Sequence, residues 1–215
     1  MVKIRTRYLD DRLEQQLGLG YQQVVILGAG LDTRAIRKQA SGVFYFEIDD
    51  LRTVSLKKAK LEENGIHANV KFIPGDYVAD DFIQLLEQND FDFNRPTHFI
   101  WEGNTMYLTP DSVQRVMADI VKYLRRFTLS FDYMAEEVIA KTTGDPGVAI
   151  LVESFANMGA PWSYGIADIK SLAEEAKMTV ADNFKTAELH RAYWPNRTVD
   201  SAIFDFYSLC TLGSS

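Results

Sequence analysis

The stretch that decides the fold is VVILGAGLDTR, residues 24–34, in which a short apolar run ends at two glycines, Gly28 and Gly30. Such a run is typical of a buried strand that turns sharply into a helix. Glycine lets the backbone approach a ligand closely, and the first turn of a helix offers unpaired N–H groups, so the turn is a candidate nucleotide-binding loop. An ordinary tight strand-to-helix turn would give the same pattern, which makes the signal weak when it stands alone.

Working outward from this turn, apolar runs of strand length alternate with longer amphipathic stretches, which predicts an α/β fold with a mainly parallel sheet. Strands are expected at residues 24–27, 43–48, 70–73, 98–101 and 127–131. Helices are expected at residues 52–63, 79–88, 110–124 and 168–177, the last two capped by Thr109 and Asp168. A strand within residues 202–212 is expected to return antiparallel to one near residues 178–184.

The 215 residues predict one domain over 1–215, since typical domains have ~150 residues. Turn-rich segments after the fifth strand suggest an insertion on the substrate side at about residues 134–167. The composition is 47% hydrophobic and 25% charged, which excludes disordered, collagen-like and coiled-coil chains.

The charge balance and the lack of sorting signals limit the partners that we expect. With 23 basic and 30 acidic residues the net charge is −7, which disfavours nucleic acid. No apolar run approaches the ~18 residues of a membrane span, and the first residues lack the apolar core of a signal peptide. The single cysteine, Cys210, excludes an internal disulfide and a multi-cysteine metal site. We therefore expect a cytoplasmic protein without a metal, acting on a small molecule, and leave a homo-oligomer open.

Acidic residues end the second strand. Asp49 lies 19 residues after Gly30, a spacing typical of a carboxylate that accepts hydrogen bonds from the two ribose hydroxyls of a nucleotide. Glu47 is a second candidate in the same strand. The alternative is that both acids only cap the following helix.

Two further acids follow the third and fourth strands. Asp76 could accept a hydrogen bond from an adenine amino group, with Tyr77 packed beside it, although a plain turn aspartate would look the same. Glu102 follows a buried strand, where an acid is costly unless it has a partner, and an ammonium group of a ligand could be that partner.

The third glycine of a dinucleotide fingerprint would fall at position 33, where the chain has Thr33. An NAD(P)-dependent oxidoreductase is therefore the weaker alternative. A ligand with adenosine but no pyrophosphate needs less room at the helix start, which favours S-adenosylmethionine as the cofactor.

Taken together, these motifs resemble the leucine carboxyl methyltransferase-like family of class I methyltransferases, which includes bacterial polyketide O-methyltransferases. Five segments carry the resemblance in the family's order: RTRYLDD (5–11), LGAGLDTR (27–34), FEID (46–49), EGNTMYL (102–108) and PWSYGI (161–166). The resemblance spans nearly the whole chain. It implies a doubly wound, Rossmann-like sheet of seven strands with the last one antiparallel, and S-adenosylmethionine as methyl donor.

The resemblance also implies roles for particular residues. Gly28 would line the methionine moiety, Asp49 would hold the ribose, Asp76 with Tyr77 would lie at the adenine, and Glu102 near the amino group. An arginine of the first segment would bind the ligand's carboxylate. Arg5 and Arg7 both fit that position, and we slightly prefer Arg7.

Members of this family usually carry a helical segment before the arginine motif, whereas four residues precede Arg5 here. Three interpretations follow: a short form with an open acceptor site, a shortened chain, or a chain that a partner subunit completes. A protein that binds S-adenosylmethionine without catalysis is a further alternative.

The expected reaction is methyl transfer to an oxygen. A carboxylate acceptor is ionised at neutral pH and needs no base, whereas a phenol usually does. The motifs contain no obvious base, and we expect all three histidines, His67, His98 and His190, to be structural. This favours a carboxylate of a small molecule. Four aromatic residues could either wall an acceptor pocket or simply pack in the protein: Trp162, Tyr164, Tyr193 and Trp194.

Overall fold

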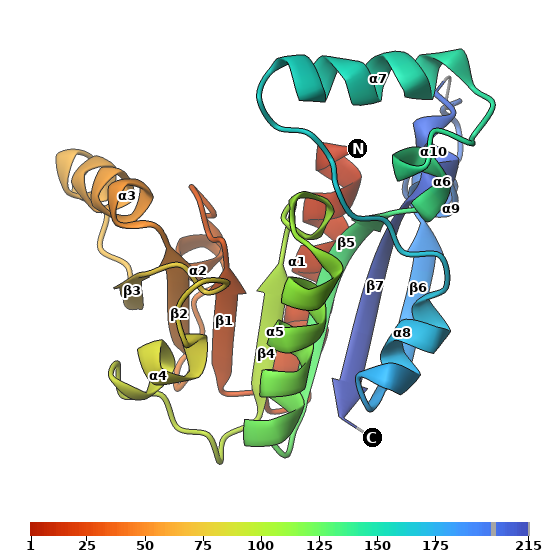
Figure 1. Ribbon diagram of the computed structural model, residues 1–215. Coiled ribbons are helices and arrows are strands. Elements are labelled where there is room, and N and C mark those ends of the chain that lie inside the picture. The colour runs from red at the N-terminus through yellow and green to blue at the C-terminus, as the bar shows by residue number, and fades with distance from the viewer. Residues whose placement is uncertain (199–200, 215) are drawn as a thin grey trace.

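The computed structural model describes residues 1–198 and 201–214. Within these residues the chain forms one seven-stranded sheet in the order β3-β2-β1-β4-β5-β7-β6 (Figure 1). The strands are β1 (Gln23–Leu27), β2 (Phe44–Asp49), β3 (Val70–Pro74), β4 (Thr97–Trp101), β5 (Phe127–Met134), β6 (Met178–Lys185) and β7 (Tyr207–Ser214). β7 runs antiparallel to both of its neighbours, β5 and β6, and the other adjacent pairs of these strands are parallel. The expected Rossmann-like α/β fold, with its antiparallel last strand, is confirmed.

The order of the strands determines where a ligand can bind. The chain winds from β1 outward to β3 and then returns to the other side of β1 as β4, so the direction of winding reverses between β1 and β4. In the register of these strands Ile26 lies beside Glu47 on one side and Ile100 on the other. The carboxyl ends of β1, β2 and β4 therefore meet at one edge of the sheet, where open α/β sheets bind their ligands.

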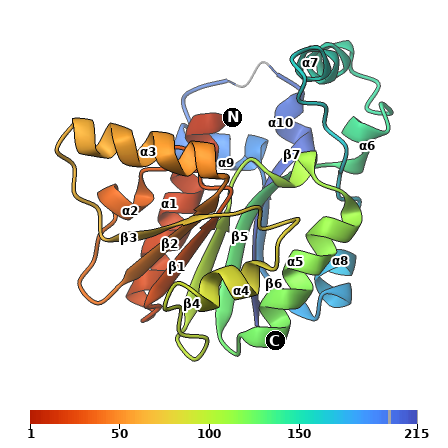
Figure 2. The ribbon, with the colours of Figure 1, turned by 60° about the vertical axis from the view of Figure 1, so that its left-hand side comes forward.

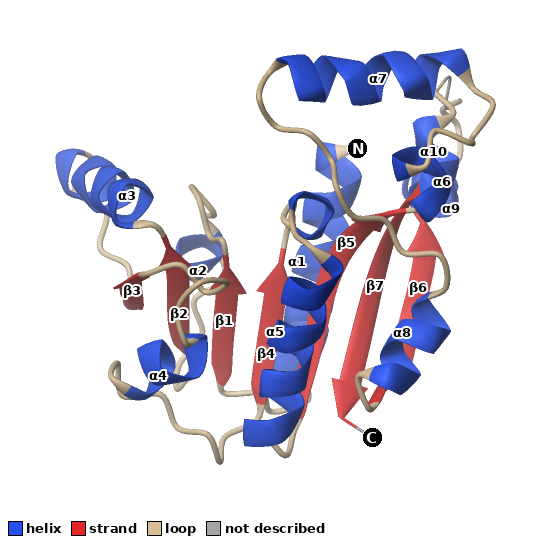
Figure 3. Ribbon diagram, in the orientation of Figure 1, coloured by secondary structure: helices blue, strands red, loops and turns tan. Residues whose placement is uncertain are grey.

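Helices cover both faces of the sheet (Figures 2 and 3). One face buries α1 (Val2–Gly18), α2 (Arg34–Arg37) and α9 (Thr186–Tyr193) in a shared apolar cluster. The other face buries α4 (Phe82–Glu87), α5 (Pro110–Tyr123) and α8 (Ile169–Glu175). The helix α3 (Leu51–Glu63) contacts β2 and β3. The four expected helices are present with shifted ends, and the side chains of Thr109 and Asp168 cap α5 and α8 as predicted.

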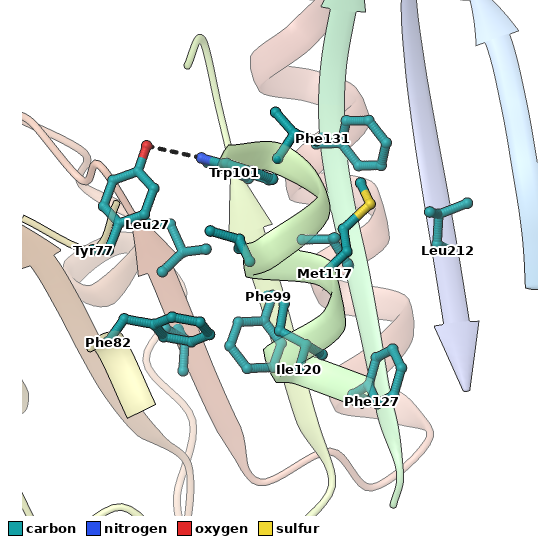
Figure 4. Close-up of a cluster of buried hydrophobic side chains, with 14 of the residues drawn as sticks. Leu27, Tyr77, Phe82, Phe99, Trp101, Met117, Ile120, Phe127, Phe131 and Leu212 are labelled. Carbon is teal, nitrogen blue, oxygen red and sulfur yellow. Dashed lines mark hydrogen bonds between the residues drawn. The ribbon is translucent and has the colours of Figure 1, made fainter. Parts of the chain in front are cut away.

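The core between α5 and the sheet is shown in Figure 4. Large side chains from β1, β4 and β5 pack against Met117 and Ile120 of α5. Trp101 ends β4 within this core, and its indole N–H donates to the hydroxyl of Tyr77 at 3.0 Å. This bond satisfies a donor that would otherwise be buried without a partner.

The sequence reasoning was wrong at the start of the last strand. Residues 202–206, expected to be extended, include the short helix α10 (Ile203–Phe206), and β7 begins only at Tyr207. Tertiary contacts explain the difference, because Ile203 is buried in an apolar cluster and the carbonyl of Phe204 accepts a hydrogen bond from Thr186 at 2.9 Å. The antiparallel pairing of β6 with β7 is confirmed.

The segment after β5 contains α6 (Glu136–Ile139) and α7 (Pro146–Asn157), and α7 lies beyond the strand ends, away from the sheet (Figure 1). A separate apolar cluster joins α7 to the connection after β4 and to the start of β7. That connection includes a short 3-10 turn, η1 (Thr105–Tyr107). The predicted insertion at residues 134–167 coincides with this region, and its role as a substrate-side unit stays a prediction.

No helix in the described part of the chain combines the length and the apolar character that crossing a membrane requires.

Candidate functional site

A cavity of about 340 Å³ opens at the carboxyl ends of β1 and β4, between α1 and the turn that leads from β1 into α2. It is therefore at the edge of the sheet where the winding reverses. Its lining is made of backbone from the glycine turn and of charged side chains: Arg5, Thr6, Ile26, Gly28, Ala29, Gly30, Leu31, Asp32, Thr33, Arg34, Arg37 and Glu102.

The glycine turn depends on glycine at two positions for different reasons. Gly28 and Gly30 have φ values of +62° and +50°, in the left-handed region that side chains disfavour. A Cβ on Gly28 would lie 2.5 Å from Oδ1 of Asn104, so Gly28 allows that side chain to pack against the turn. A Cβ on Gly30 would meet no atom within 4 Å. The backbone at Gly30 is thus open to a ligand in the cavity.

Asp49 is fixed against this turn. Its Oδ2 accepts a hydrogen bond from the N–H of Gly30 at 2.6 Å, and its Oδ1 accepts one from the N–H of Asp50 at 2.7 Å. Burial raises the pKa of the Asp49 carboxyl, while these backbone bonds act in the opposite direction. The side chain that caps α3 is Asp50. The capping alternative for Asp49 is therefore wrong, and the carboxylate lies beside Gly30, as the spacing predicted.

Glu47 has a different environment. Its side chain is buried and forms an ion pair with Lys57 of α3. Burial raises the pKa of the Glu47 carboxyl to about 7, and the opposite effect of the Lys57 ammonium offsets only part of this shift. Its Oε1 has no hydrogen-bond partner among the described residues, and Glu47 is not among the side chains that line the cavity.

Glu102 is the centre of an ion-pair network in the cavity wall. Its Oε1 accepts from Nε of Arg5 at 2.7 Å, and its Oε2 accepts from Nη1 of Arg34 at 2.6 Å. Arg34 is buried and also binds Asp10, with Nε and Oδ1 2.8 Å apart, as well as Asp32. The acid after β4 thus finds its partners within the protein, and each oxygen keeps a lone pair for a ligand.

The two candidate arginines of α1 lie in different places. Arg5 lines the cavity, whereas Arg7 does not and is half exposed. The Arg7 guanidinium lies over the ring of Tyr193, 4.1 Å from its centroid, and its Nε is 3.9 Å from Asp11. This geometry favours Arg5 over Arg7 and reverses the preference that we drew from the sequence.

The residues expected at an adenine lie in the turn after β3. Oδ1 of Asp76 accepts from the backbone N–H groups of Val78 and Ala79 at 2.9 and 3.1 Å. Tyr77 is buried beside Trp101, with the two rings edge to face, and burial raises its pKa to about 12. Neither Asp76 nor Tyr77 lines the cavity as it stands.

The start of α2 is already occupied by a side chain. Oδ1 of Asp32 accepts from the backbone N–H of Arg34 at 2.6 Å, and the Asp32 carboxylate also pairs with the Arg34 guanidinium. A dinucleotide site needs these N–H groups for its pyrophosphate. The carboxylate of Asp32 takes one of them, the N–H of Arg34, and places a negative charge where the pyrophosphate would lie, which disfavours a dinucleotide.

The histidines and aromatic residues lie outside the cavity. His98 is fully buried beside Thr128, and burial lowers its pKa to about 3, so it is neutral at pH 7. Trp162 packs on Phe155 of α7, with ring centroids 4.6 Å apart, and Tyr193 lies on the α1 face with α9. Among the described residues, no histidine lines the cavity.

Sequence reasoning missed four residues that shape the site: Asn104, Arg34, Asp132 and Tyr207. Asn104 donates to the backbone carbonyl of Glu102 at 2.7 Å and packs on Gly28. Arg34 belongs to the quoted glycine segment but was assigned no role. Asp132 is a lone acid inside the apolar strand β5, which could have marked it. Nothing local distinguishes Tyr207, because its role depends on contacts with distant segments.

Comparison with known proteins gives matches at the level of both sequence and fold. A family model described as leucine carboxyl methyltransferase matches residues 1–121. A protein of Mycobacterium ulcerans named "Putative S-adenosyl-L-methionine-dependent methyltransferase" is 36% identical over 123 residues, which cover 56% of this chain and 41% of that protein. A protein of Mycobacterium tuberculosis with the same description is 38% identical over 119 residues, or 54% of this chain and 36% of that one. The match thus spans about two fifths of the length of these relatives.

Solved structures show the fold alone, because the sequence identities are low. Magnesium protoporphyrin IX methyltransferase from Synechocystis, with bound S-adenosylhomocysteine, superposes with a TM-score of 0.61 at 12% identity, covering 99% of this chain and 84% of that one. Mitomycin 7-O-methyltransferase gives a TM-score of 0.57 at 10% identity, covering 91% and 50%.

Proposed function

The chain belongs to the leucine carboxyl methyltransferase family, and from this premise we propose that it binds S-adenosylmethionine and transfers the methyl group to a carboxylate oxygen of a small-molecule acceptor. The curated relatives carry S-adenosylmethionine in their names, which supports the choice of methyl donor.

One observation carries the proposal: the N–H of Gly30, which lines the cavity, holds the Asp49 carboxylate directly behind the wall, and a Cβ on Gly30 would meet nothing within 4 Å. Asp49 itself is not among the lining residues of the cavity. Each Asp49 oxygen accepts one backbone hydrogen bond and keeps a lone pair. Two vicinal hydroxyls of a ribose are the donors that such a carboxylate suits. A ligand that contains adenosine fits this arrangement.

The charges of the wall also suit this ligand. Three guanidinium groups, Arg5, Arg34 and Arg37, face four carboxylates, Asp10, Asp32, Glu102 and Asp132, so the network has one excess negative charge. S-adenosylmethionine carries a sulfonium, an ammonium and a carboxylate, and is a net cation. Its carboxylate would bind Arg5, and its ammonium would lie near Glu102.

Bound S-adenosylmethionine supplies an electrophilic methyl group on a sulfonium. The protein's part is to hold the acceptor oxygen in line with the methyl and the sulfur, and such positioning can contribute roughly 7–11 kcal/mol. We propose that Asp49 anchors the ribose of the ligand and that Arg5 anchors its carboxylate. Because a carboxylate acceptor is ionised at neutral pH, the reaction requires no base in the wall.

We propose further that the segment at residues 134–167 forms the acceptor side. The apolar cluster that joins α7 to the connection after β4 includes Met106, Met134, Val152 and Trp162. Side chains of this kind favour an apolar or aromatic acceptor over a highly charged one. Intermediates of polyketide type that bear a carboxyl group belong in the first panel of substrates.

The test is incubation of the protein with S-adenosylmethionine carrying a labelled methyl group and a panel of carboxylic acids and phenols. A labelled product that releases methanol in mild base is the expected result, because methyl esters are base-labile and aryl ethers are not. Label in a base-stable product would contradict the carboxylate acceptor. Binding of S-adenosylhomocysteine without transfer to any acceptor would favour a non-catalytic binding protein, and binding of NAD(P) alone would overturn the proposal.

A further inference from the structure

A buried tyrosine and a buried aspartate lie directly behind Arg5. Nη1 of Arg5 donates to the hydroxyl of Tyr207 at 3.0 Å, and this hydroxyl donates to Oδ2 of Asp132. Asp132 has no exposed surface, and Tyr207 is 2% exposed. Burial and the neighbouring Asp132 raise the pKa of Tyr207, so its hydroxyl keeps its proton and can accept from Arg5 and donate to Asp132 at the same time.

These contacts account for most of the guanidinium of Arg5. Nε is bound to Glu102, and Nη1 is bound to Tyr207, with Asp132 Oδ2 further away at 3.5 Å. Within residues 1–198 and 201–214, Nη2 donates to no residue. The guanidinium is therefore held through Nε and Nη1, and Nη2 is left to bind an anion. Because Arg5 lines the cavity, that anion can belong to a ligand there.

Asp132 also holds the segment after β4. Its Oδ1 accepts from the N–H of Gly103 at 2.6 Å, and its backbone carbonyl accepts from Oγ1 of Thr105 at 2.6 Å. The Arg5 guanidinium lies so close to Gly103 that a Cβ there would be 3.1 Å from Nη1. Asp132 therefore holds both Arg5 and the backbone at Gly103, against which the Arg5 guanidinium packs.

Stability alone gives a weak reason for such a group. Replacing a buried ion pair by well-packed apolar side chains is often neutral or stabilising. Here the buried carboxylate lies in the strand β5, yet its partners are Arg5 of the cavity wall, Tyr207, which binds Arg5, and the N–H of Gly103, next to Glu102 of the wall. These partners indicate that the Asp132 carboxylate acts mainly on the geometry of the cavity wall.

We propose that Tyr207 and Asp132 are positioning residues that aim Arg5 at the carboxylate of the bound methyl donor. The Tyr207 hydroxyl acts as a spacer: without it, Nη1 would be drawn toward Asp132 and the fork would turn away from the cavity. The inference rests on the proposed function, because it presupposes that S-adenosylmethionine is the ligand.

The test compares two ligands that differ by one group. S-adenosylmethionine and its decarboxylated analogue share the adenosine, the sulfonium and the ammonium, but only the first has the carboxylate. Their dissociation constants are measured by calorimetry for the wild type, for Tyr207→Phe and for Tyr133→Phe. Tyr133 is the matched control, because it is a buried tyrosine of β5 whose hydroxyl donates to Asn183 at 3.0 Å, away from Arg5.

We expect Tyr207→Phe to weaken S-adenosylmethionine about fivefold to tenfold, the size of a partly lost charged hydrogen bond, and to leave the analogue within about twofold. Tyr133→Phe should change neither. A general structural role would weaken both ligands alike, and that result would overturn the inference, as would unchanged binding of S-adenosylmethionine by Tyr207→Phe. A wild type that binds neither ligand would instead overturn the proposed function, and the inference with it.

A second variant covers the case that Tyr207→Phe does not fold. Asp132→Asn keeps an oxygen for the N–H of Gly103 and removes the charge that anchors the Tyr207 hydroxyl. The same selective loss is expected, with S-adenosylmethionine weakened and the analogue unaffected. Equal loss for both ligands, or no loss for either, would contradict the positioning role.

Discussion

Replacing Asp49 by asparagine should weaken the binding of S-adenosylhomocysteine without unfolding the glycine turn. Asparagine has nearly the same shape as aspartate, and its one carbonyl oxygen can still accept from the N–H of Gly30, which Asp49 binds at 2.6 Å. The variant loses the negative charge and one of the two acceptor oxygens. The change therefore acts on the ligand more than on the fold.

The magnitude follows from the hydrogen bonds that the ligand would lose. A hydrogen bond to a charged group contributes about 1.5–3 kcal/mol, against about 0.5–1.5 kcal/mol for a neutral pair. One ribose hydroxyl loses its acceptor and the other keeps a weaker one, so the net loss is about 2 kcal/mol, or about 30-fold in the dissociation constant. Burial raises the pKa of the Asp49 carboxyl, so the affinity of the wild type should also fall as the pH drops through that pKa.

Isothermal calorimetry measures this loss directly, and the chain offers a neighbouring control. Asp50 is exposed and caps α3 by accepting from the N–H groups of Arg52 and Thr53. Asparagine is as good an N-cap as aspartate, so Asp50→Asn should keep both the helix and the affinity. Binding by Asp49→Asn equal to the wild type, or an equal loss in both variants, would refute the ribose assignment.

Three further predictions concern the cavity wall and the residues around it. Arg5→Ala should weaken S-adenosylhomocysteine about tenfold or more, whereas Arg7→Ala, outside the cavity, should leave it unchanged in the same calorimetric titration; the opposite pattern would restore Arg7 as the anchor. Gly28→Ala should lower the free energy of unfolding by about 2 kcal/mol in urea titrations, because the new Cβ combines a positive φ with a clash on Asn104; wild-type stability would contradict the packing. The pKa of Glu47 is raised from 4.5 to about 7, so the contribution of this carboxyl to stability is fully present below pH 4.5 and is lost as the pH rises to about 7. Urea unfolding should therefore show that the wild type loses stability relative to Glu47→Gln between pH 5 and pH 8. Parallel pH profiles of the two proteins would disprove this prediction.

The sequence predicts the parts of this fold that local patterns determine. Continuous apolar runs located the five parallel strands to within a few residues. Four of these strands, β1, β2, β4 and β5, are buried along most of their length, as such runs predict, whereas β3 at the edge of the sheet is mostly exposed or half-buried. The helix α1 was not predicted, although two pairs of its buried side chains, Ile4 with Tyr8 and Leu9 with Leu13, have the four-residue spacing of an amphipathic helix. The helical start of the C-terminal segment was missed because its apolar residues suit a strand equally well. There the contacts of Ile203 decide the structure.

The site shows the same division between local and distant information. Asp49 could be placed from spacing, because adjacent parallel strands in register bring the end of β2 beside the glycine turn. Arg5 and Glu102 are 97 residues apart, and no periodicity indicates that they meet. The choice between Arg5 and Arg7 depends on which side of α1 faces the sheet. That orientation is a property of the packed fold.

Buried charge explains why the least predictable residues are the ones that complete the site. A carboxylate such as Asp132 can be buried inside an apolar strand only if donors from elsewhere reach it, and here they come from β7, from the segment after β4 and from α1. The hydrogen bonds that hold the Asp132 carboxylate also hold each of these donors in place. A single buried acid thereby aligns three segments that are distant in the sequence, which makes the direction of Arg5 depend on how α1, the segment after β4 and β7 pack around β5.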